Sequence, residues 1–303
     1  MYDFIGDIHG HADHLEQLLS KLGYTNSAGT YTHKTRKAFF VGDYIDRGPK
    51  IRKTLEIVRS MVDNGNAIAL LGNHEYNALC FHAKRPEGGH LRKHSIKNII
   101  QHFKTLEQFQ NQQNEYEDYL DWFKTLPVFY EEENFRAVHA AWDKSSISYL
   151  KQHLNNNCLT DDLIAESCRK GSPLKNSIEI TIKGKEIKMP DPLFFIDKDG
   201  THRQEIRIKW WNDPVGTTYK EISIEPIDNL PHTVIEPSAF TNLDYYQEED
   251  KPIFFGHYWL KGNPFLYRNN ICCLDYSVAK HGHLAAYRFD GEKDLEVAKL
   301  FYV

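Results

Sequence analysis

Residues 37–48 read KAFFVGDYIDRG, a short apolar run followed by a glycine and then by Asp43, Asp46 and Arg47. Short apolar runs rich in Phe, Ile and Val are typical of buried strands. Four further runs of this kind also lead to a polar residue able to bind metal: YDFIGDIH at 2–9, AIALLGNH at 67–74, FRAVHA at 135–140 and PIFFGH at 252–257. The repeated pattern predicts five buried strands, each with a polar side chain at or just beyond its end.

Helical patterns separate the first three of these strands. Residues 11–23 carry leucines at helical spacing and stop at Gly23, and residues 48–65 place Ile51, Leu55 and Val58 on one face. A strand–helix–strand order implies parallel pairing and a layered α/β fold. Because ligands of open α/β sheets gather beyond the carboxyl ends of the strands, the polar residues are expected to meet at one edge.

The polar residues at the strand ends form a set of metal ligands. Asp, Asn and His suit manganese, iron, zinc or magnesium. One carboxylate can bridge two cations, and such a pair binds phosphoryl oxygens, lowers the pKa of a bridging water and offsets charge in the transition state of phosphate ester hydrolysis. The proposed set is Asp7, His9, Asp43, Asn73, His139 and His257.

The remaining sequence is expected to insert into this framework. Residues 80–127 look helical and polar, and within them residues 84–104 are basic. Two interpretations of the basic stretch stay open: a solvated helix face, or a docking patch for a phosphorylated substrate. We expect a single domain over 1–303, with a helical insertion at about 80–127 and a mixed insertion at about 145–250.

The mixed insertion contains two pieces that read as hairpins. One is IEITIKGKEIKM, centred on Gly184, and the other is FFIDKDGTHRQEIRIKWW, centred on Gly200. Alternating β-branched residues around a glycine favour two antiparallel strands joined by a turn. Both pieces are therefore predicted to be strands.

The composition bears on nucleic-acid binding, on the state of the cysteines and on location. The 37 basic and 42 acidic residues give a formal net charge of −5, so strong non-specific binding of nucleic acid is not expected. The five cysteines lack zinc-finger spacing and are expected to be reduced thiols in a reducing compartment. The first residues, MYDFIGDIHG, do not resemble a signal peptide, and no apolar stretch is long enough to span a membrane. A cytoplasmic location without membrane association is expected.

Five ordered motifs carry a resemblance to a known family. GDIHG at 6–10, GDYIDRG at 42–48, GNHE at 72–75, VHA at 138–140 and GH at 256–257 resemble those of the phosphoprotein phosphatase family of calcineurin-like metallophosphoesterases. That family includes serine/threonine phosphatases, bacterial protein phosphatases and diadenosine tetraphosphatases. The resemblance implies an α/β fold in which a central β-sandwich of mixed sheets is flanked by helices.

The resemblance also implies roles for individual residues. Asp7 and His9 would bind the first metal ion, Asp43 would bridge, and Asn73, His139 and His257 would bind the second. Manganese is the expected metal, with iron, zinc and magnesium as alternatives. The catalytic residues implied are His74 as general acid, Asp46 as its orienting carboxylate and Arg47, and the phosphate-binding residues are Arg47, Asn73 and Arg207.

Some positions depart from the family pattern or remain open. The fourth motif continues as Ala140-Ala141-Trp142, where the family usually has glycine, and Trp142 is expected to wall the site. For the second phosphate-binding arginine, Arg203 and Arg207 are both candidates and Arg207 is preferred. Trp210 and Trp211 are expected to pack in the core. His102 and six other histidines in helical or loop sequence receive no role.

The expected activity is hydrolysis of phosphomonoesters by direct attack of a metal-bound hydroxide. The expected substrates are phosphopeptides, small phosphomonoesters or nucleotides, which makes a protein serine/threonine or tyrosine phosphatase one form of the prediction. The first alternative is a hydrolase of dinucleoside polyphosphates or nucleic-acid end phosphates. The second is a non-catalytic scaffold with the same fold, against which the intact ligand set argues.

Overall fold

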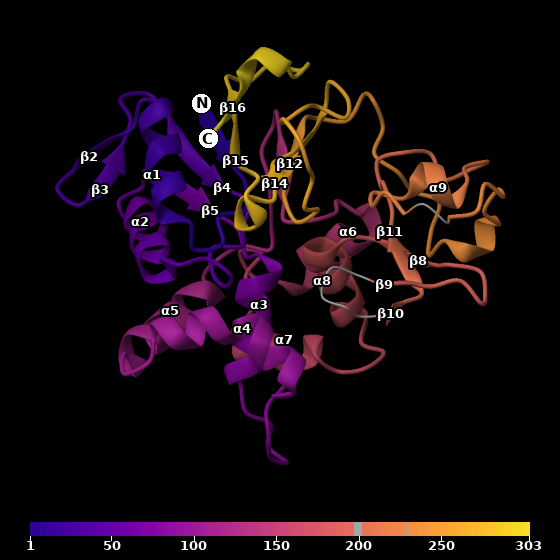
Figure 1. The fold of residues 1–303 in the computed structure, drawn as a ribbon, viewed down its shortest axis with the longest axis horizontal. Coiled ribbons are helices and arrows are strands. Elements are labelled where there is room, and N and C mark those ends of the chain that lie inside the picture. Colours follow the sequence, from indigo (N-terminus) through magenta and orange to yellow (C-terminus); the bar gives the residue numbers. More distant parts are fainter. Residues whose placement is uncertain (197–201, 228–229) are drawn as a thin grey trace.

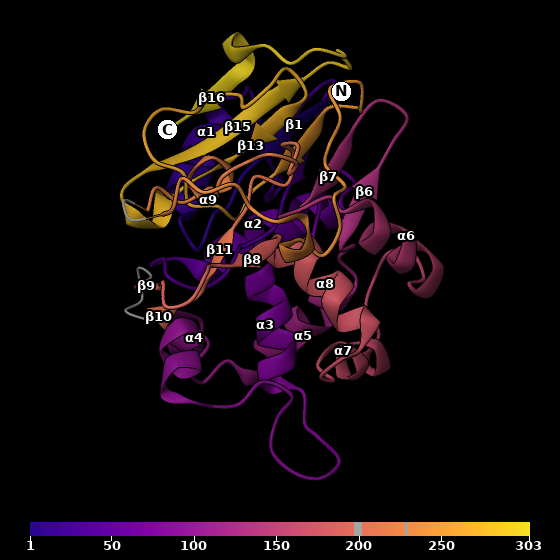
Figure 2. The ribbon, with the colours of Figure 1, turned by 90° about the vertical axis from the view of Figure 1, so that its right-hand side faces the viewer.

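The computed structural model describes residues 1–196, 202–227 and 230–303. Its centre is two β-sheets that face each other (Figures 1 and 2). The first sheet has the order β14-β15-β1-β4-β5, with β16 paired to β15. Its strands are β1 (Tyr2–Ile5), β4 (Lys37–Phe40), β5 (Ala67–Ala69), β14 (Asp275–Tyr276), β15 (His283–Phe289) and β16 (Leu300–Tyr302).

The second sheet has the order β13-β12-β7-β6. Its strands are β6 (Phe129–Glu131), β7 (Arg136–Val138), β12 (Ile253–Phe255) and β13 (Ile271–Cys273). Between the sheets, the rings of Phe4 on β1 and Phe254 on β12 stack with their centroids 3.7 Å apart. Phe135 meets Phe4 edge to face at 5.0 Å. Because these rings are fully buried, the aromatic residues of the apolar runs form the core of the sandwich.

Both sheets are mixed. β1, β4 and β5 run parallel, and β15 pairs with β1 antiparallel, with Tyr2 opposite Phe289. In the second sheet β7, β12 and β13 are parallel and β6 is antiparallel. The expected β-sandwich of mixed sheets flanked by helices is therefore confirmed. All five predicted strands occur in the parallel parts, so their carboxyl ends point the same way within each sheet.

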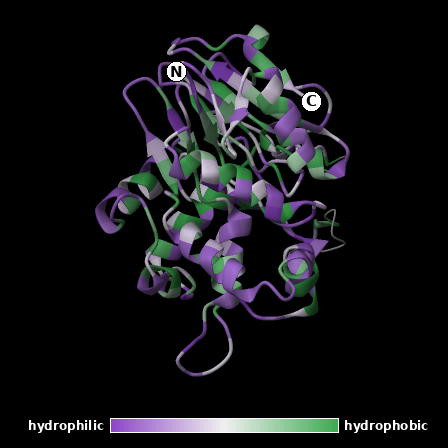
Figure 3. Cartoon of the chain, turned by 90° about the vertical axis from the view of Figure 1, so that its left-hand side faces the viewer, coloured by the Kyte–Doolittle hydropathy of each residue, from purple (hydrophilic) through white to green (hydrophobic). Residues whose placement is uncertain are grey.

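In Figure 1, α1 and α2 lie to the left of the sandwich, and α3 to α8 lie below it. α1 and α2 pack against the first sheet, and α3 packs on α5 and α7. Figure 3 shows hydrophobic and hydrophilic residues alternating along the helices, as expected where only one face is buried. Their bounds are α1 (Ala12–Lys21), α2 (Ile51–Asp63), α3 (Asn73–His82), α4 (Ile96–Gln108), α5 (Gln113–Lys124), α6 (Lys144–His153), α7 (Asp161–Ser167), α8 (Pro173–Lys183) and α9 (Tyr219–Ile222).

The prediction of a hairpin centred on Gly184 is wrong. Residues 173–183 form α8, which begins with Pro173 and ends at Gly184 with φ +89°. Leu174, Ile178 and Ile182 recur every four residues and are buried against the rest of the protein. This tertiary burial outweighs the strand preference of the β-branched residues. Only the second half of the piece is a strand, β8 (Glu186–Lys188), which pairs with β11 (Glu205–Arg207).

The second predicted hairpin is seen in part. β9 (Phe195–Ile196) pairs antiparallel with β10 (His202–Arg203), and Gly200 lies outside the described residues. A small apolar cluster, separate from the main core, holds this region together and includes Ile187, Ile206 and Ile222. One further hairpin, β2 (Thr25–Ser27) and β3 (Thr30–Thr32), follows α1. Among the described residues, no helix is long and apolar enough to cross a membrane.

Candidate metal centre and active site

The predicted ligands lie beyond the carboxyl ends of parallel strands from both sheets. Each of β1, β4, β7 and β12 ends shortly before its ligand, and β5 leads through a short turn into α3, which begins with Asn73. The ligands that these elements carry are Asp7 and His9 after β1, Asp43 after β4, Asn73 at the start of α3, His139 after β7 and His257 after β12. Segments separated by up to 250 residues thus meet at one place, as the contact between His257 and Asp7 shows.

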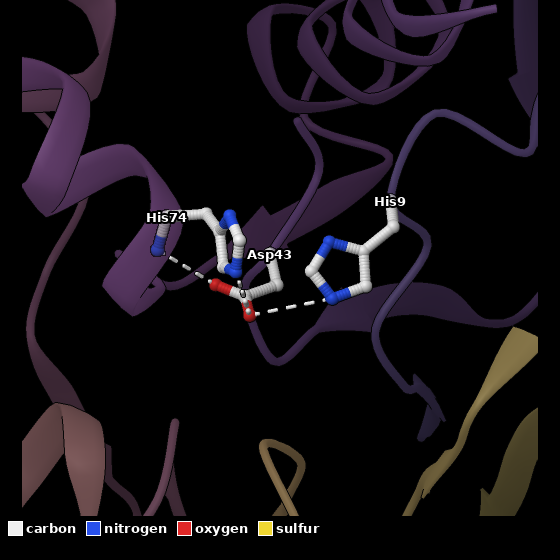
Figure 4. A group of neighbouring side chains, drawn as sticks. All are labelled: His9, Asp43 and His74. Carbon is white, nitrogen blue, oxygen red and sulfur yellow. Dashed lines mark hydrogen bonds and ion pairs between the residues drawn. The ribbon is translucent and has the colours of Figure 1, made fainter. Parts of the chain in front are cut away.

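Asp43 lies at the centre of the group. Its Oδ2 is 3.6 Å from His9 Nε2 and its Oδ1 is 3.3 Å from His139 Nε2. The backbone N–H of His74 donates to Oδ1 at 3.0 Å. Figure 4 shows His9 and His74 on either side of this carboxylate. Two compact groups of potential ligands share Asp43, one with His9 and His74 and the other with His139 and His257, which is the arrangement a bridging carboxylate requires.

The second group is held together by the amide of Asn73. Asn73 Oδ1 is 2.7 Å from His257 Nδ1 and 3.0 Å from His139 Nε2. On its other side the His139 ring donates from Nδ1 to the backbone oxygen of Val41 at 2.8 Å. A backbone acceptor of this kind fixes the tautomer and directs the remaining ring nitrogen inward. The three side chains therefore present their ligand atoms to one small space.

In the first group, a backbone oxygen orients the ring of His9 in the same way. Its Nδ1 donates to the backbone oxygen of Ile45 at 3.0 Å, which leaves Nε2 as the inward-facing atom. Burial, followed by the neighbouring His74, lowers the pKa of His9 to about 3. The ring is therefore neutral and has a lone pair to offer, as a metal ligand must.

Buried polar atoms without partners test whether these residues fit a metal. Asp7 Oδ1, His9 Nε2 and His257 Nε2 are buried and lack a hydrogen-bond partner among the described residues. Such atoms are costly unless something satisfies them. All three belong to the predicted ligand set, and their oxygen and imidazole donors suit divalent cations. The donor set fits the group that the sequence predicts, although His74 rather than Asp7 completes the compact group around His9.

The backbone of the site is strained where the ligands lie. His9, Asp43, Asp46, Arg47 and His257 all have positive φ, between +45° and +74°. Each such residue costs on the order of 1–3 kcal/mol and persists only where the surroundings enforce it. Five of the twelve non-glycine residues with positive φ in the described part of the chain are predicted site residues, so the surrounding structure holds these loops in shape.

Glycines before the ligands allow the loops to approach one another. A Cβ added at Gly256 would collide with the carboxylate of Asp7, and one at Gly72 would collide with Asp43. Glycine is needed here because the neighbouring ligand occupies the space, a reason that the sequence pattern alone does not reveal.

His74 forms a buried network with Asp46. Its Nδ1 is 2.5 Å from Asp46 Oδ2, while Asp46 Oδ1 accepts from His102 Nδ1 at 2.8 Å and from the hydroxyl of Thr105. Tyr116 bonds the far side of the His102 ring at 2.8 Å. Burial alone would lower the pKa of His74, but Asp43 and Asp46 outweigh it and raise this pKa.

His102 was expected to have no role at the site, and the structure corrects this expectation. It is buried on α4 and directly contacts the carboxylate that orients His74. Its position within a polar helical stretch concealed it, because an isolated histidine on a helix is usually a surface or core residue. The contact depends on how α4 packs across the loop after β4, and no local pattern encodes that.

Glu75 is a second residue of the site for which the sequence predicted no role. Its carboxylate is fully buried and accepts hydrogen bonds from the backbone N–H groups of Gly72, Asp43, Tyr44 and Ile45, at 2.8–3.2 Å. It ties the loop after β4 to the start of α3. Glu75 therefore positions Asp43 and His74 relative to each other.

Replacing Glu75 should destabilise the fold. In Glu75→Gln an amide NH₂ replaces one acceptor oxygen and faces buried N–H donors, so we expect a loss of about 2–3 kcal/mol in the free energy of unfolding. Urea unfolding monitored by circular dichroism measures this loss. Glu133→Gln, at an exposed position, is the matched control and should change stability by less than about 0.5 kcal/mol. Equal effects of the two variants would contradict the role of Glu75.

A cavity opens beside this network. Arg47, His74 and His257 line it together with Trp259 and Arg207. The Arg47 guanidinium lies over the ring of Trp259 at 4.3 Å, and among the described residues its buried Nε has no hydrogen-bond partner. Arg207 lies within ion-pair distance of Glu225, at 3.4 Å, and of Glu186, at 3.7 Å. The two arginines predicted from the sequence thus face the same space, and Arg203 lines it too.

The tryptophan beside this cavity is not the one expected. Trp142 is buried, with its ring edge to face with Phe129 at 5.9 Å and covered by Arg136 at 5.0 Å. Trp259 takes the place beside the cavity because its backbone N–H donates to the buried carboxylate of Asp275 at 2.6 Å. The signal in the sequence was its position two residues after His257. Trp210 and Trp211 pack in the core, as predicted.

The basic stretch 84–104 divides into two kinds of position. Residues 83–95 are not helical, and Lys93 is exposed. Arg92 instead lines the cavity, and it donates to the amide oxygens of Asn77 at 3.0 Å and Gln101 at 2.9 Å. Asn77 lies one turn along α3 from Asn73, and Gln101 precedes His102. Arg92 is therefore a pocket residue.

Two compact groups of potential metal ligands share Asp43 at the strand ends of a two-sheet sandwich, and Arg47 and Arg207 line the adjoining cavity. The chain belongs to the calcineurin-like phosphoesterase family, whose model matches residues 2–258. The resemblance to phosphoprotein phosphatases is confirmed at this level.

Curated relatives match a limited part of the chain. The asymmetrical bis(5′-nucleosyl)-tetraphosphatase PrpE of Oceanobacillus iheyensis is 47% identical over 73 residues, which cover 24% of this chain and 29% of the relative. The enzyme of the same name from Bacillus subtilis is 40% identical over 74 residues, covering 24% of this chain and 30% of the relative. The match spans less than a third of these relatives.

Solved structures align over most of the chain at low identity. A serine/threonine phosphatase from Saccharomyces cerevisiae covers 100% of this chain and 78% of its own, with a TM-score of 0.49 and 12% identity. A cold-active protein-tyrosine phosphatase of a psychrophilic Shewanella species covers 97% of this chain and 80% of its own, with a TM-score of 0.45 and 18% identity. At these values the alignments carry no argument about substrate.

Proposed function

We propose that this chain hydrolyses phosphate monoesters with two divalent metal ions held around Asp43. The observation that carries the proposal is the position of Asp43, whose two carboxylate oxygens lie 3.6 Å from His9 Nε2 and 3.3 Å from His139 Nε2, next to the His74–Asp46 pair. Metal sites that serve only structure are usually closed by protein ligands. Here the ligands adjoin a cavity that also contains a proton donor and arginines, which supports a catalytic role.

The proposed ligands of the first ion are Asp7, His9 and Asp43, and those of the second are Asp43, Asn73, His139 and His257. When bound, the ion pair supplies positive charge at the phosphoryl oxygens and lowers the pKa of water. Manganese suits these oxygen and nitrogen donors and is the metal we propose. The buried atoms of Asp7, His9 and His257 that lack a hydrogen-bond partner among the described residues support the proposed ligand set.

The protein's own groups bind the phosphate and move the proton. Arg47 and Arg207 would bind phosphoryl oxygens, to which planar guanidinium groups are well matched. Asn73 would assist them through its amide. His74, with Nδ1 held by Asp46, would keep a proton on Nε2 and donate it to the leaving oxygen. His102 and Thr105 keep the Asp46 carboxylate in place and thus orient His74 indirectly.

Phosphomonoesters, including phosphopeptides, are the leading substrate class because the site needs only a phosphoryl group and an accessible leaving oxygen. Phosphoserine, phosphothreonine and phosphotyrosine peptides all meet that requirement. The five free cysteines support a reducing compartment, which we propose is the cytoplasm.

Hydrolysis of dinucleoside polyphosphates is the second candidate. The curated relatives carry that activity in their names, and the cavity contains more cationic residues than one phosphoryl group requires, since Arg92 and Lys280 line it beside the two arginines above. Trp259 and Phe81 also line it and offer flat faces for a base. A longer anionic chain would use these extra groups, whereas a monoester would not.

Metal removal tests the proposed function directly. Purified protein should lose hydrolysis of p-nitrophenyl phosphate in a chelator and recover it best with manganese, because the ligand atoms suit that ion and leave positions for water. Activity is measured after dialysis and again after each metal is added back. Full activity in protein shown by elemental analysis to be free of metal would overturn the two-metal proposal.

Arg92 should discriminate between the two substrate classes. Arg92→Ala removes a charge-assisted contact to an anion deep in the cavity, so we expect KM for diadenosine tetraphosphate to rise about tenfold with kcat little changed. KM for p-nitrophenyl phosphate should change far less. The measurement is a kinetic panel of phosphopeptides, dinucleoside polyphosphates and phosphorylated oligonucleotides.

Lys93→Ala is the matched control for Arg92, because Lys93 is its neighbour in sequence but is exposed. It should leave KM unchanged for every substrate. Equal effects of the two variants would indicate that residues 84–104 act only through their overall surface charge. A kcat/KM for diadenosine tetraphosphate far above that of every monoester would reverse the ranking of the two candidate functions.

A further inference from the structure

Two cysteines that are distant in the sequence lie in contact outside the metal centre. Cys80 is on α3 and Cys168 directly follows α7, and their Sγ atoms are 3.3 Å apart. A disulfide requires a separation of about 2.05 Å, so the two sulfurs need to approach by only about 1.2 Å. Cys80 is buried and Cys168 is half-buried, which gives a small oxidant access to one of them.

The two thiols differ in their chemistry. The hydrogen bond with Cys80, together with the Tyr76 hydroxyl and the nearby Lys183, lowers the pKa of Cys168 to about 6 despite partial burial. The same contact and burial raise the pKa of Cys80. A thiolate is the nucleophile in thiol oxidation, and a neighbouring thiol then resolves the product. Cys168 has the properties of the attacking group and Cys80 those of the resolving group.

The other cysteines lack this arrangement. Cys272 and Cys273 are buried neighbours on β13, where successive side chains point to opposite faces of the sheet. The Cys158 sulfur contacts the backbone oxygens of Thr125 and Asn156. Facing sulfurs therefore single out Cys80 and Cys168 within the part of the chain that the structure describes.

Helix α3 connects this pair to the active site. Asn73 and His74 begin the helix, and Cys80 lies about two turns further along it. The backbone oxygen of Cys80 also accepts from the N–H of Arg92 at 2.8 Å. A covalent bond at Cys80 would pull on the helix that carries His74 and on the loop that places Arg92.

We propose that Cys80 and Cys168 form a reversible disulfide on exposure to a hydroperoxide, and that this bond lowers catalytic activity through α3. In the first step the Cys168 sulfur attacks one peroxide oxygen and the O–O bond breaks, which gives a sulfenic acid and hydroxide. The Cys80 sulfur then attacks the Cys168 sulfur, the S–S bond forms, and the S–O bond breaks with loss of a second hydroxide. Each hydroxide takes up one thiol proton, so two thiols and one hydrogen peroxide yield a disulfide and two waters.

Thiol counting tests the bond itself. Hydrogen peroxide should reduce the titratable thiols of the denatured 303-residue chain from five to three, because two of the five cysteines are consumed. Peptide mapping should join the segments that contain Cys80 and Cys168, and dithiothreitol should restore all five thiols. In Cys80→Ser, dimedone should instead trap a sulfenic acid on Cys168. Five thiols after treatment, or a disulfide between other cysteines, would overturn the proposal.

Turnover tests the coupling to the active site. A displacement of about 1 Å at a catalytic group can reduce rate by about 10²-fold, so oxidised wild-type protein should lose about 10- to 100-fold in kcat and regain it with dithiothreitol. Cys168→Ser, a conservative change at a half-buried position, should keep its activity under the same peroxide. Cys158→Ser should behave like the wild type. An equal loss of kcat in Cys168→Ser would assign the effect to oxidation of the metal centre and overturn the coupling. The thiol count does not depend on the proposed hydrolysis, so it tests the disulfide even if the proposed function is wrong.

Discussion

His74→Asn should lower the turnover of alkyl phosphate esters by about 10²–10⁴-fold while both metal ions stay bound. The backbone N–H of His74 donates to Asp43, and the His74 ring is held by Asp46 through Nδ1. The asparagine amide should keep a contact to Asp46, but its N–H groups are too weakly acidic to protonate a leaving alkoxide. An alkyl leaving group depends on that proton, so the loss falls on kcat.

The leaving group separates acid catalysis from general damage to the site. With p-nitrophenyl phosphate, whose leaving group needs little protonation, the loss in His74→Asn should be far smaller. Metal content by elemental analysis should match the wild type, and His153→Asn, at an exposed position on α6, should leave both rates unchanged. Equal losses on alkyl and aryl esters would remove the general-acid assignment.

Asp43→Asn should nearly abolish metal-dependent hydrolysis by weakening retention of both ions. Replacing a residue that only supports a metal ligand costs about 10–100-fold in affinity or activity, and Asp43 contacts the ligand groups on both sides. Asparagine removes the negative charge that two cations would share. The fall in affinity should therefore exceed that of replacing any ligand of one ion alone, such as His9.

The measurement is the metal content of Asp43→Asn after gel filtration, with activity assayed over a range of manganese concentrations. Excess manganese should restore part of the activity if the remaining ligands still hold the ions weakly. His9→Asn is the matched control, because His9 belongs to one ligand group only. Retention of both ions by Asp43→Asn at wild-type affinity would exclude Asp43 as the bridge.

The strands and the ligand set were predictable because their signals are local. A buried strand that ends in glycine and then in Asp, Asn or His can be read within a few residues, as in PIFFGH at 252–257. The order of the five motifs along the chain then indicated the family and its β-sandwich fold. The assigned roles of these residues stay predictions until the variants above are measured, and the single-domain boundary stays one as well.

The errors arose where packing overrides local preference. IEITIK reads as a strand, yet it forms the end of α8, because Leu174, Ile178 and Ile182 lie on one helical face that the core buries. In the same way Trp142 was expected at the site from its neighbours in sequence. The Trp142 ring packs against Phe129 and Arg136 instead. Asp275 binds the backbone N–H of Trp259, and it is Trp259 that lies beside the cavity.

The sequence by itself determined the family, because its motifs are local and the predicted ligands lie shortly beyond the ends of five strands. Only the tertiary structure decided how these ligands are supported. His102 reaches Asp46 across 56 positions, Glu75 gathers backbone N–H groups from two loops, and Cys80 meets Cys168 across 88 positions. Contacts of this kind form when separate elements pack, so their partners are set by distance in space, which local propensity and motif spacing do not encode.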